Sequence, residues 1–229
     1  MTKRFPGLLA FVLAIASAVP AMGHSLEEVD QNLRDVEKYF QTVDVDAPDF
    51  ALQDVNGRSI RLADLRGKVL ILHFIYTSCG DVCPLHTDRL AQIQTMVNQT
   101  PMKSMVEFVT ITTDPKRDTG PALRYYAEAH GVDASNWMFL TAQAGEPEDS
   151  TRKLAAAYGL QFSQDKDGMQ MHGLVTFVID QDGRERARFH GLKFEPVNLV
   201  LFVNALTNRT QKPHAHPEPG WWDKIRGFF

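Results

Sequence analysis

Residues 69–84 read VLILHFIYTSCGDVCP, and their pattern predicts the centre of the fold. Its first part, Val69 to Tyr76, is an apolar run interrupted by one histidine, and its length and β-branched content predict a strand buried on both faces. Cys79 and Cys83 follow directly, and Pro84 is expected to occupy the first position of a helix. The sequence therefore predicts a buried strand, a loop that carries two cysteines, and a helix.

The flanking sequence alternates between strand and helix patterns. Apolar residues recur at helical spacing in several segments, and short apolar runs bounded by turn residues indicate strands. Asn56-Gly57 and Gln181-Asp182-Gly183 are typical hairpin turns. This alternation predicts an α/β fold, a three-layer sandwich with a central mixed β-sheet. The expected helices are residues 26–40, 84–97, 121–130, 147–158 and 196–206, and the further expected strands are 106–112, 137–140, 174–180 and 184–189.

The N-terminus predicts export. Basic residues Lys3 and Arg4, an apolar run from Leu8 to Val19, and the small residues of Ala21-Met22-Gly23 are typical of a secretory signal peptide. A cleaved signal would release the protein into the periplasm, whereas an uncleaved one would anchor it to the inner membrane. The expected regions are a signal peptide over 1–23, a helical lead-in over 24–42, one domain over 43–207 and a tail over 208–229.

Charge and composition exclude one class of function. The net charge is −4 and 23% of residues are charged, so the chain lacks the basic excess of a nucleic-acid-binding protein. The tail ends in aromatic and basic residues, from Trp221 to Phe229, which predicts either a loosely packed terminus or a weak contact with a membrane surface.

The cysteine loop carries the chemistry. Cys79 and Cys83 are the two cysteines of the chain, and they lie between a buried strand and a helix N-terminus. The free N–H groups and the dipole of a helix N-terminus lower the pKa of a thiol, and the thiolate both attacks disulfides and binds Cu(I). In an oxidising compartment such a pair can form a disulfide, exchange one or bind a soft metal.

A metal site needs a further ligand, and His172 is the candidate. It precedes the strand expected from Leu174, in a loop that lies against the cysteine loop in thioredoxin-like folds. Thioredoxins normally place a cis-proline there, but no proline occurs between Ser163 and Asp180. Two thiolates and one imidazole form a three-coordinate soft site that suits Cu(I), and Cu(II) with an added ligand, whereas zinc ordinarily takes four protein ligands.

Three motifs in this order resemble the Sco/SenC family: Cys79-x-x-x-Cys83-Pro84, the run from Thr112 to Thr119, and Met171-His172-Gly173. The resemblance implies a thioredoxin-like fold in which Cys79, Cys83 and His172 carry copper, as Cu(I), Cu(II) or both. It also implies a role in assembling the binuclear copper centre of cytochrome c oxidase. The implied partners are the copper-acceptor domain of oxidase subunit II and a copper donor chaperone. Many family members keep a membrane anchor or lipid attachment. A chain whose signal peptide is cleaved would differ from them in this respect.

Other interpretations of the cysteine pair stay open. An exported thiol-disulfide oxidoreductase would use Cys79 and Cys83 as a redox-active pair without metal. It would reduce the disulfide-bonded cysteines of a partner protein. A copper sensor or store would use the same ligands without delivery. A peroxiredoxin-like peroxidase is excluded, because its threonine position falls on Tyr76 when counted from Cys79 and on Gly80 when counted from Cys83.

Three more residues near the motifs have two interpretations each. Asp114 matches an acid that the family places close to the site, or it only ends a strand before Pro115. His86, three residues after Cys83, is a competing ligand candidate whose side chain we expect to point toward solvent. His73 interrupts the buried strand and is expected to be a core histidine.

Overall fold

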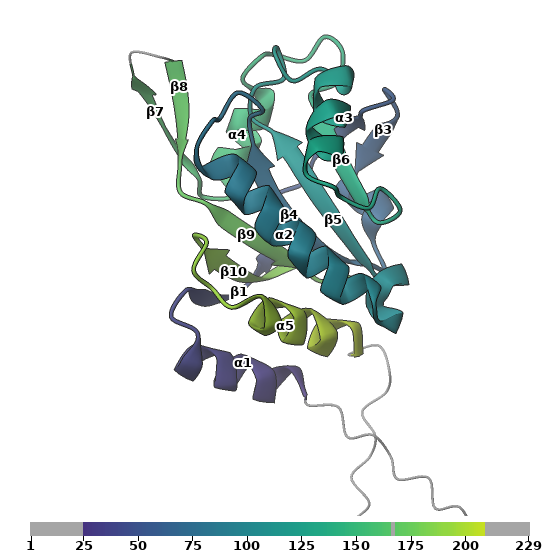
Figure 1. Cartoon of the computed structure of the whole chain (residues 1–229), viewed down its shortest axis with the longest axis vertical. Coiled ribbons are helices and arrows are strands. Elements are labelled where there is room, and N and C mark those ends of the chain that lie inside the picture. Colours follow the sequence, from purple (N-terminus) through teal and green to yellow (C-terminus); the bar gives the residue numbers. More distant parts are fainter. Residues whose placement is uncertain (1–24, 166–167, 209–229) are drawn as a thin grey trace, which may run out of the picture.

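The apolar run quoted above forms strand β4, Val69–Ile75, in the middle of an eight-stranded sheet (Figure 1). The computed structural model describes residues 25–165 and 168–208, and the side chains of residues 164–172 lie outside its description. Every residue of β4 is buried, because other elements cover both faces of the sheet. The predicted central strand is confirmed.

The sheet is mixed, in the order β1-β10-β9-β4-β5-β6-β2-β3. β4 pairs with β5 and β5 with β6 in parallel, while the other neighbours are antiparallel. Strands β7 and β8 form a separate hairpin. The strands are β1 Phe40–Asp46, β2 Ala51–Asp54, β3 Ser59–Arg61, β5 Val106–Thr112, β6 Trp137–Thr141, β7 Gln161–Asp165, β8 Gly168–His172, β9 Val175–Ile179 and β10 Arg184–His190. The helices are α1 Leu26–Val36, α2 Val82–Asn98, α3 Gly120–Ala129, α4 Ser150–Ala157 and α5 Pro196–Asn208, with short 3-10 turns η1 Leu62–Leu65 and η2 Pro101–Ser104.

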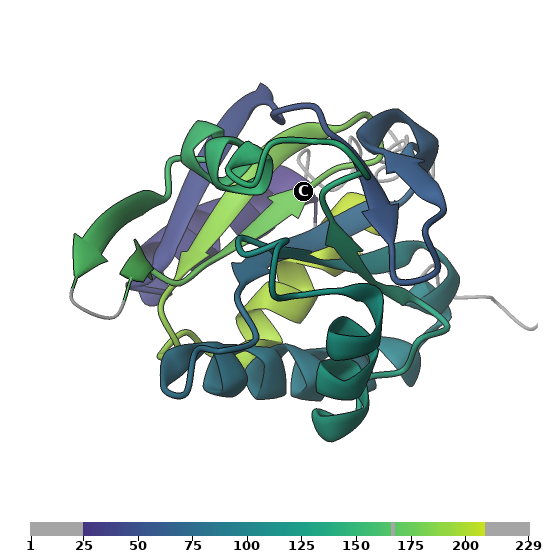
Figure 2. The ribbon, with the colours of Figure 1, turned by 90° about the horizontal axis from the view of Figure 1, so that it is seen from above.

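Two hydrophobic cores lie on opposite faces of the sheet. Successive residues of a strand point to opposite faces, so β4 contributes Val69 and Ile71 to one core and Leu70 and Leu72 to the other. Helices α1, α2, α3 and α5 complete the first core, and α4 and η1 contribute to the second. Figure 2 shows α2 and α3 on one side of the sheet and α4 on the other. The predicted α/β three-layer sandwich of thioredoxin-like type is confirmed.

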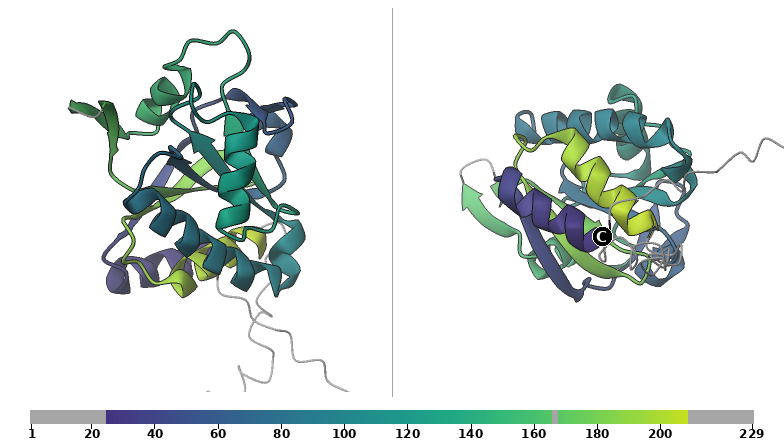
Figure 3. Two further views of the ribbon diagram at one scale, coloured as in Figure 1. Left: turned by 45° about the horizontal axis from the view of Figure 1, so that its top comes forward. Right: turned by 90° about the horizontal axis from the view of Figure 1, so that it is seen from below.

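The first helix is shorter than predicted. α1 ends at Val36, and Phe40 begins β1, which pairs with β10. The buried carboxylate of Glu37 explains the end of the helix, because it accepts hydrogen bonds from the backbone N–H of Glu195 at 2.9 Å and from the amide of Asn198 at 2.8 Å. This contact ties the end of α1 to the start of α5, and the two helices lie side by side in Figure 3.

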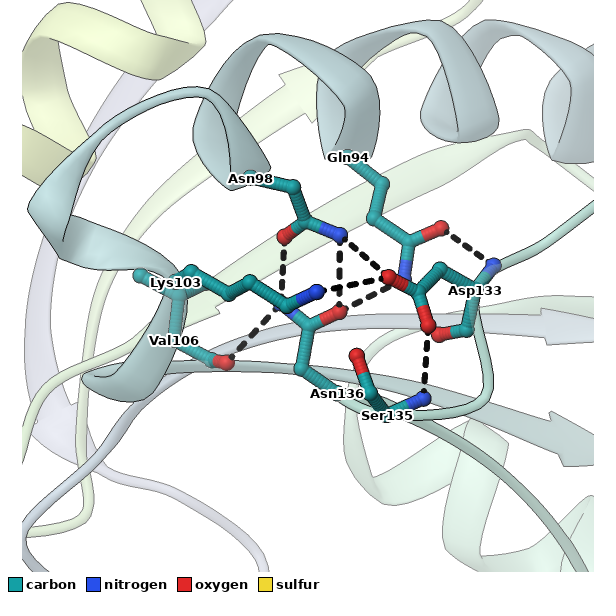
Figure 4. A network of polar contacts seen from close by, with 7 residues as sticks. All are labelled: Gln94, Asn98, Lys103, Val106, Asp133, Ser135 and Asn136. Atoms are coloured by element: carbon teal, nitrogen blue, oxygen red, sulfur yellow. Dashed lines mark hydrogen bonds and ion pairs between the residues drawn. The ribbon is translucent and has the colours of Figure 1, made fainter.

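A polar network fixes the C-terminal half of α2 (Figure 4). The amide of Gln94 accepts from the backbone N–H of Asp133 at 2.8 Å and donates to Asn136 at 2.7 Å. Asn98 on the next turn of the helix also bonds to both residues, and Lys103 forms an ion pair with Asp133. Because Gln94 and Asn136 are buried, these bonds hold α2 firmly against the strand layer. The helix that begins at the cysteines is therefore anchored at its far end.

Candidate metal centre

The loop from β4 to α2 brings the two cysteines together. The backbone N–H of Cys79 donates to the carbonyl of Tyr76 at 3.1 Å, and the backbone N–H of Cys83 donates to the sulfur of Cys79 at 3.4 Å. Both side chains are buried free thiols, exposed by 6% and 1%. The prediction for Pro84 was wrong, because α2 begins two residues earlier, at Val82. Cys83 therefore lies inside the first turn. Its backbone N–H has no acceptor within the helix and is available for the Cys79 sulfur.

The environment separates the two thiols chemically. Burial raises the pKa of Cys79, but hydrogen bonds from the Cys83 thiol and from the backbone of Cys83 and Asp81 outweigh burial, and the pKa falls below its usual value. Burial raises the pKa of Cys83, and the hydrogen bond and the charge of Cys79 raise it further. Cys79 is thus the cysteine of the pair that ionises first, and Cys83 is the thiol that donates to it.

Asp118 anchors the cysteine loop through hydrogen bonds, and the sequence analysis assigned it no role. Its carboxylate is fully buried and accepts from the backbone N–H of Thr77 at 3.0 Å, from the Thr77 hydroxyl and from the Thr112 hydroxyl. Its charge also contributes to the raised pKa of Cys83. Asp118 belongs to the Thr112 to Thr119 motif, so the motif was found but not its function as an anchor.

The backbone of His172 ends β8, next to the cysteine loop in the topology. β9 runs antiparallel to β4 with Phe177 opposite Leu72. The pairing of β4 with β9 ends at Leu72 and Phe177, and two residues, Gly173 and Leu174, separate His172 from the start of β9. The β7–β8 hairpin and this loop occur at the same end of the molecule in Figure 1. The side chain of His172 lies outside the described residues, and its role as a ligand stays a prediction.

The expectation for His86 was wrong. Its side chain is 1% exposed, and its Nε2 lies 2.8 Å from the hydroxyl of Thr176 on β9. The ring packs edge to face against His73, with centroids 5.0 Å apart. His73 is fully buried, with ring nitrogens 3.5 Å from the hydroxyls of Thr87 and Thr110, so its assignment to the core is confirmed. Two imidazoles therefore form a buried pair between β4 and α2.

Lowering the pH from 7.5 to 4.5 should destabilise the fold through this pair. Burial lowers the pKa of His86 from 6.5 to about 4, and burial together with His86 lowers the pKa of His73. The unfolded chain takes up a proton as the pH falls through about 6.5, whereas folded His86 does so only near its lowered pKa, so the free energy of unfolding decreases on acidification. We expect a loss of about 2 to 3 kcal/mol from His86.

Urea unfolding at pH 7.5, 6.0 and 4.5 tests this prediction on the parent and on His86→Gln. The glutamine amide does not titrate and can keep a hydrogen bond to Thr176. The variant should lose clearly less stability than the parent over this range. An equal loss in both proteins would show that His86 does not cause the acid sensitivity.

The donor set at the cysteine loop fits a soft metal only in part. Among the side chains that the structure describes, no group of three or more His, Cys, Asp or Glu residues is placed to hold a metal ion. The loop offers two sulfur ligands, which Cu(I) prefers, and an imidazole from His172 would complete a three-coordinate site. A three-coordinate site at this loop would thus take its third ligand from outside the described side chains.

Comparison with known proteins identifies the family. The profile described as SCO1/SenC matches residues 45–201, which is most of the chain. The chain belongs to the SCO1/SenC family. A SCO2-like protein of Rickettsia conorii is 30% identical over 157 residues, covering 68% of this chain and 74% of its own. The mitochondrial SCO2 homolog of Bos taurus is 31% identical over 137 residues, covering 59% of this chain and 50% of its own.

Solved structures of the family share the fold. A SCO1/SenC family lipoprotein from Bacillus anthracis has a TM-score of 0.65 and 23% identity, covering 72% of this chain and 97% of its own. Yeast Sco1, solved with copper bound, has a TM-score of 0.59 and 20% identity, covering 78% and 98% of the two chains. The three family motifs noted in the sequence therefore occur in a chain with the family's architecture.

The helices of the Sco-type domain are all short or amphipathic. Within residues 25–165 and 168–208, none combines the length and the hydropathy that crossing a bilayer requires. The expected signal peptide over 1–23 and the aromatic tail from 209 lie outside the described residues.

Proposed function

We propose that this protein is a copper metallochaperone that binds copper through Cys79, Cys83 and His172 and delivers it to the binuclear copper centre of cytochrome c oxidase. The observation that carries the proposal is the buried pair at the start of α2, in which the pKa of Cys79 is lowered and Cys83 donates a hydrogen bond to its sulfur. Family members support it: Sco proteins of yeast and Arabidopsis thaliana were solved with copper bound, and BsSco is described as a member of the Sco family of cytochrome c oxidase assembly proteins.

The chemistry of delivery follows from the two thiols. The Cys79 thiolate offers the first bond to copper, and Cys83 releases its proton when the metal becomes its partner. Copper then moves by stepwise exchange, in which each new bond to an acceptor sulfur forms as one bond to this chain breaks. If the pair instead reduces a partner disulfide, two electrons pass to the partner and Cys79 and Cys83 become a disulfide, which cannot bind copper.

Location and partners complete the proposal. A signal peptide over 1–23 would direct the protein to the periplasm, soluble when cleaved and anchored to the inner membrane when not. The copper-acceptor domain of oxidase subunit II is the proposed recipient, and a copper donor chaperone would load the site. The tail from Trp221 to Phe229 would add a weak membrane contact.

A thiol-disulfide oxidoreductase is the second candidate, and the same pair favours it. A lowered thiol pKa at Cys79 beside a protonated Cys83 is also what an attacking and a resolving cysteine need. The two functions differ in their need for His172, because an imidazole ligand is required for copper and not for disulfide exchange.

Copper stoichiometry on the reduced protein without its signal peptide tests the proposal. We expect one tightly held copper per chain, a thiolate-to-Cu(II) absorption band when Cu(II) is bound, and transfer to the metal-free copper domain of subunit II. No stable copper, with Cys79 and Cys83 still cycling with thiols, would leave an exported oxidoreductase. Stable copper that never moves to the acceptor would leave a sensor or store.

A further inference from the structure

A recess of about 140 Å³ opens beside the cysteine loop. Its walls come from four elements that meet at this end of the fold: the end of β4, the loop from β5 to α3, helix α4 and strand β7. The lining residues are Tyr76, Thr113, Asp114, Arg117, Arg152 and Phe162. We propose that this recess binds an acidic side chain of the protein that exchanges copper or thiols with Cys79 and Cys83. The inference rests on the proposed function and names the chemistry by which the partner is recognised.

The charge of the recess favours an anion. Two guanidinium groups and one carboxylate line it, so its lining carries a net positive charge. Arg117 forms an ion pair with Asp114 through its Nε. Arg152 donates one long hydrogen bond of 3.4 Å to the carbonyl of Thr113, and among the described residues no carboxylate forms an ion pair with it. The Arg152 guanidinium thus keeps most of its capacity to bind a carboxylate through two parallel bonds.

The carboxylates that directly precede α4 form their ion pairs with lysines and not with Arg152. Asp149 forms an ion pair with Lys153 at 2.8 Å, and Glu148 forms one with Lys116 at 3.1 Å. These pairs occupy the acidic groups that precede Arg152 on the chain. A carboxylate from another molecule would therefore meet a guanidinium that forms no ion pair within the described residues.

The size of the recess suits one side chain. Its volume is close to that of the cavity of about 150 Å³ that holds a benzene ring in an engineered protein core. Tyr76 and Phe162 supply aromatic surface against which the methylene groups of a glutamate or aspartate can pack. The walls therefore match an acidic side chain in both charge and shape.

The position of the recess couples it to the cysteines. Tyr76 lines it, and the carbonyl of Tyr76 accepts the backbone N–H of Cys79. The first turn of α2 presents Val82 and Leu85 to solvent, exposed by 37% and 54%. Exposed apolar side chains near the cysteines and a cationic recess beside them suit a protein surface better than a free anion, because a free anion would not use the apolar contacts.

Copper transfer to the metal-free copper domain of oxidase subunit II tests the inference. Arg152→Glu should lower the second-order transfer rate constant at low salt by about tenfold or more, because it replaces attraction by repulsion in the encounter. Lys153→Glu is the matched control, with the same charge reversal one residue away on α4 and outside the recess, and should change the rate less than about threefold. Added salt should slow the parent and speed Arg152→Glu, because it screens the attraction in the first and the repulsion in the second.

The copper absorption band of each variant shows whether the metal site is intact. An acidic residue of the acceptor changed to arginine should restore the rate of Arg152→Glu and so identify the docked side chain. Equal transfer rates for Arg152→Glu and Lys153→Glu would overturn the inference and leave the proposed function standing. Weak binding of acetate or phosphate to the parent with no effect of Arg152→Glu on transfer would likewise overturn it. A parent that binds copper and transfers none would overturn the proposed function itself.

Discussion

Replacing any one of Cys79, Cys83 and His172 should lower the affinity for copper by on the order of a hundredfold or more, because each change removes one of three proposed ligands. Cys79→Ser, Cys83→Ser and His172→Ala are the variants. Competition with a Cu(I) chelator measures the affinity, and the thiolate-to-Cu(II) band should weaken in every variant. A His172→Ala protein that keeps the affinity of the parent would remove His172 from the site.

The two cysteine variants should differ from each other in thiol reactivity. In Cys83→Ser the remaining Cys79 still receives hydrogen bonds from the backbone of residues 81 and 83, which favour its thiolate. In Cys79→Ser the remaining Cys83 is 1% exposed, and burial alone raises its pKa. Alkylation by iodoacetamide at pH 7 should therefore be about tenfold or more faster in Cys83→Ser.

His172→Ala is the matched control for that comparison. It leaves both thiols in place, so its alkylation should follow the parent even though copper is lost. Equal alkylation rates in Cys79→Ser and Cys83→Ser would contradict the assignment of Cys79 as the cysteine with the lower pKa. Together, the chelator and alkylation experiments separate the metal function of the loop from its thiol chemistry.

Much of this fold could be predicted from sequence because its central elements have strong patterns. A strand buried on both faces is a continuous apolar run, and β4 and β5 both show one. For the β7–β8 hairpin, QFSQDKDGMQMH, the sequence predicts only a turn at residues 165–168, because the hairpin forms a sheet of its own and has little apolar periodicity. The edge strand β1 was missed: its first residue, Phe40, was assigned to the preceding helix and the rest to no element, since most of its residues are exposed and its pairing with β10 is distant in sequence.

The candidate site shows the same division between local and tertiary information. The cysteine spacing is local and was sufficient to locate the loop. The burial of His86 was missed, although His86, Leu90, Ile93 and Val97 recur at helical spacing on one face of α2. The anchoring by Asp118 depends on contacts with Thr77, which lies 41 residues away in sequence, so no local pattern contains it.

Asp118→Ala should lower the free energy of unfolding by about 4 kcal/mol and weaken copper binding about tenfold or more. The substitution removes the acceptor of three hydrogen bonds and leaves the Thr77 N–H and two hydroxyls without their partner inside the protein. Thr77 lies two residues before Cys79, so the loss frees the segment that holds the thiolate. Copper would then have to order a loop that the parent already holds in place, which lowers the affinity.

Graded variants separate the anchor from general damage to the fold. Thr112→Val removes one donor and should cost less than Asp118→Ala in both stability and affinity. Asp114→Asn is the matched control, because it removes a carboxylate four residues away that pairs with exposed Arg117 at the surface, and it should cost less than about 1 kcal/mol. Urea unfolding gives the stability, and chelator competition gives the affinity on the folded fraction.

The ratio between the two effects decides the role of Asp118. If Asp118 only stabilises the domain, copper affinity of the folded protein would stay at the parent value while stability falls. If Asp118 positions the cysteine loop, affinity and stability should fall together across Thr112→Val and Asp118→Ala, and the thiolate-to-Cu(II) band should broaden or shift. The second outcome is expected, because the bonds of Asp118 end on Thr77 within the loop itself and on Thr112 at the end of the adjacent strand.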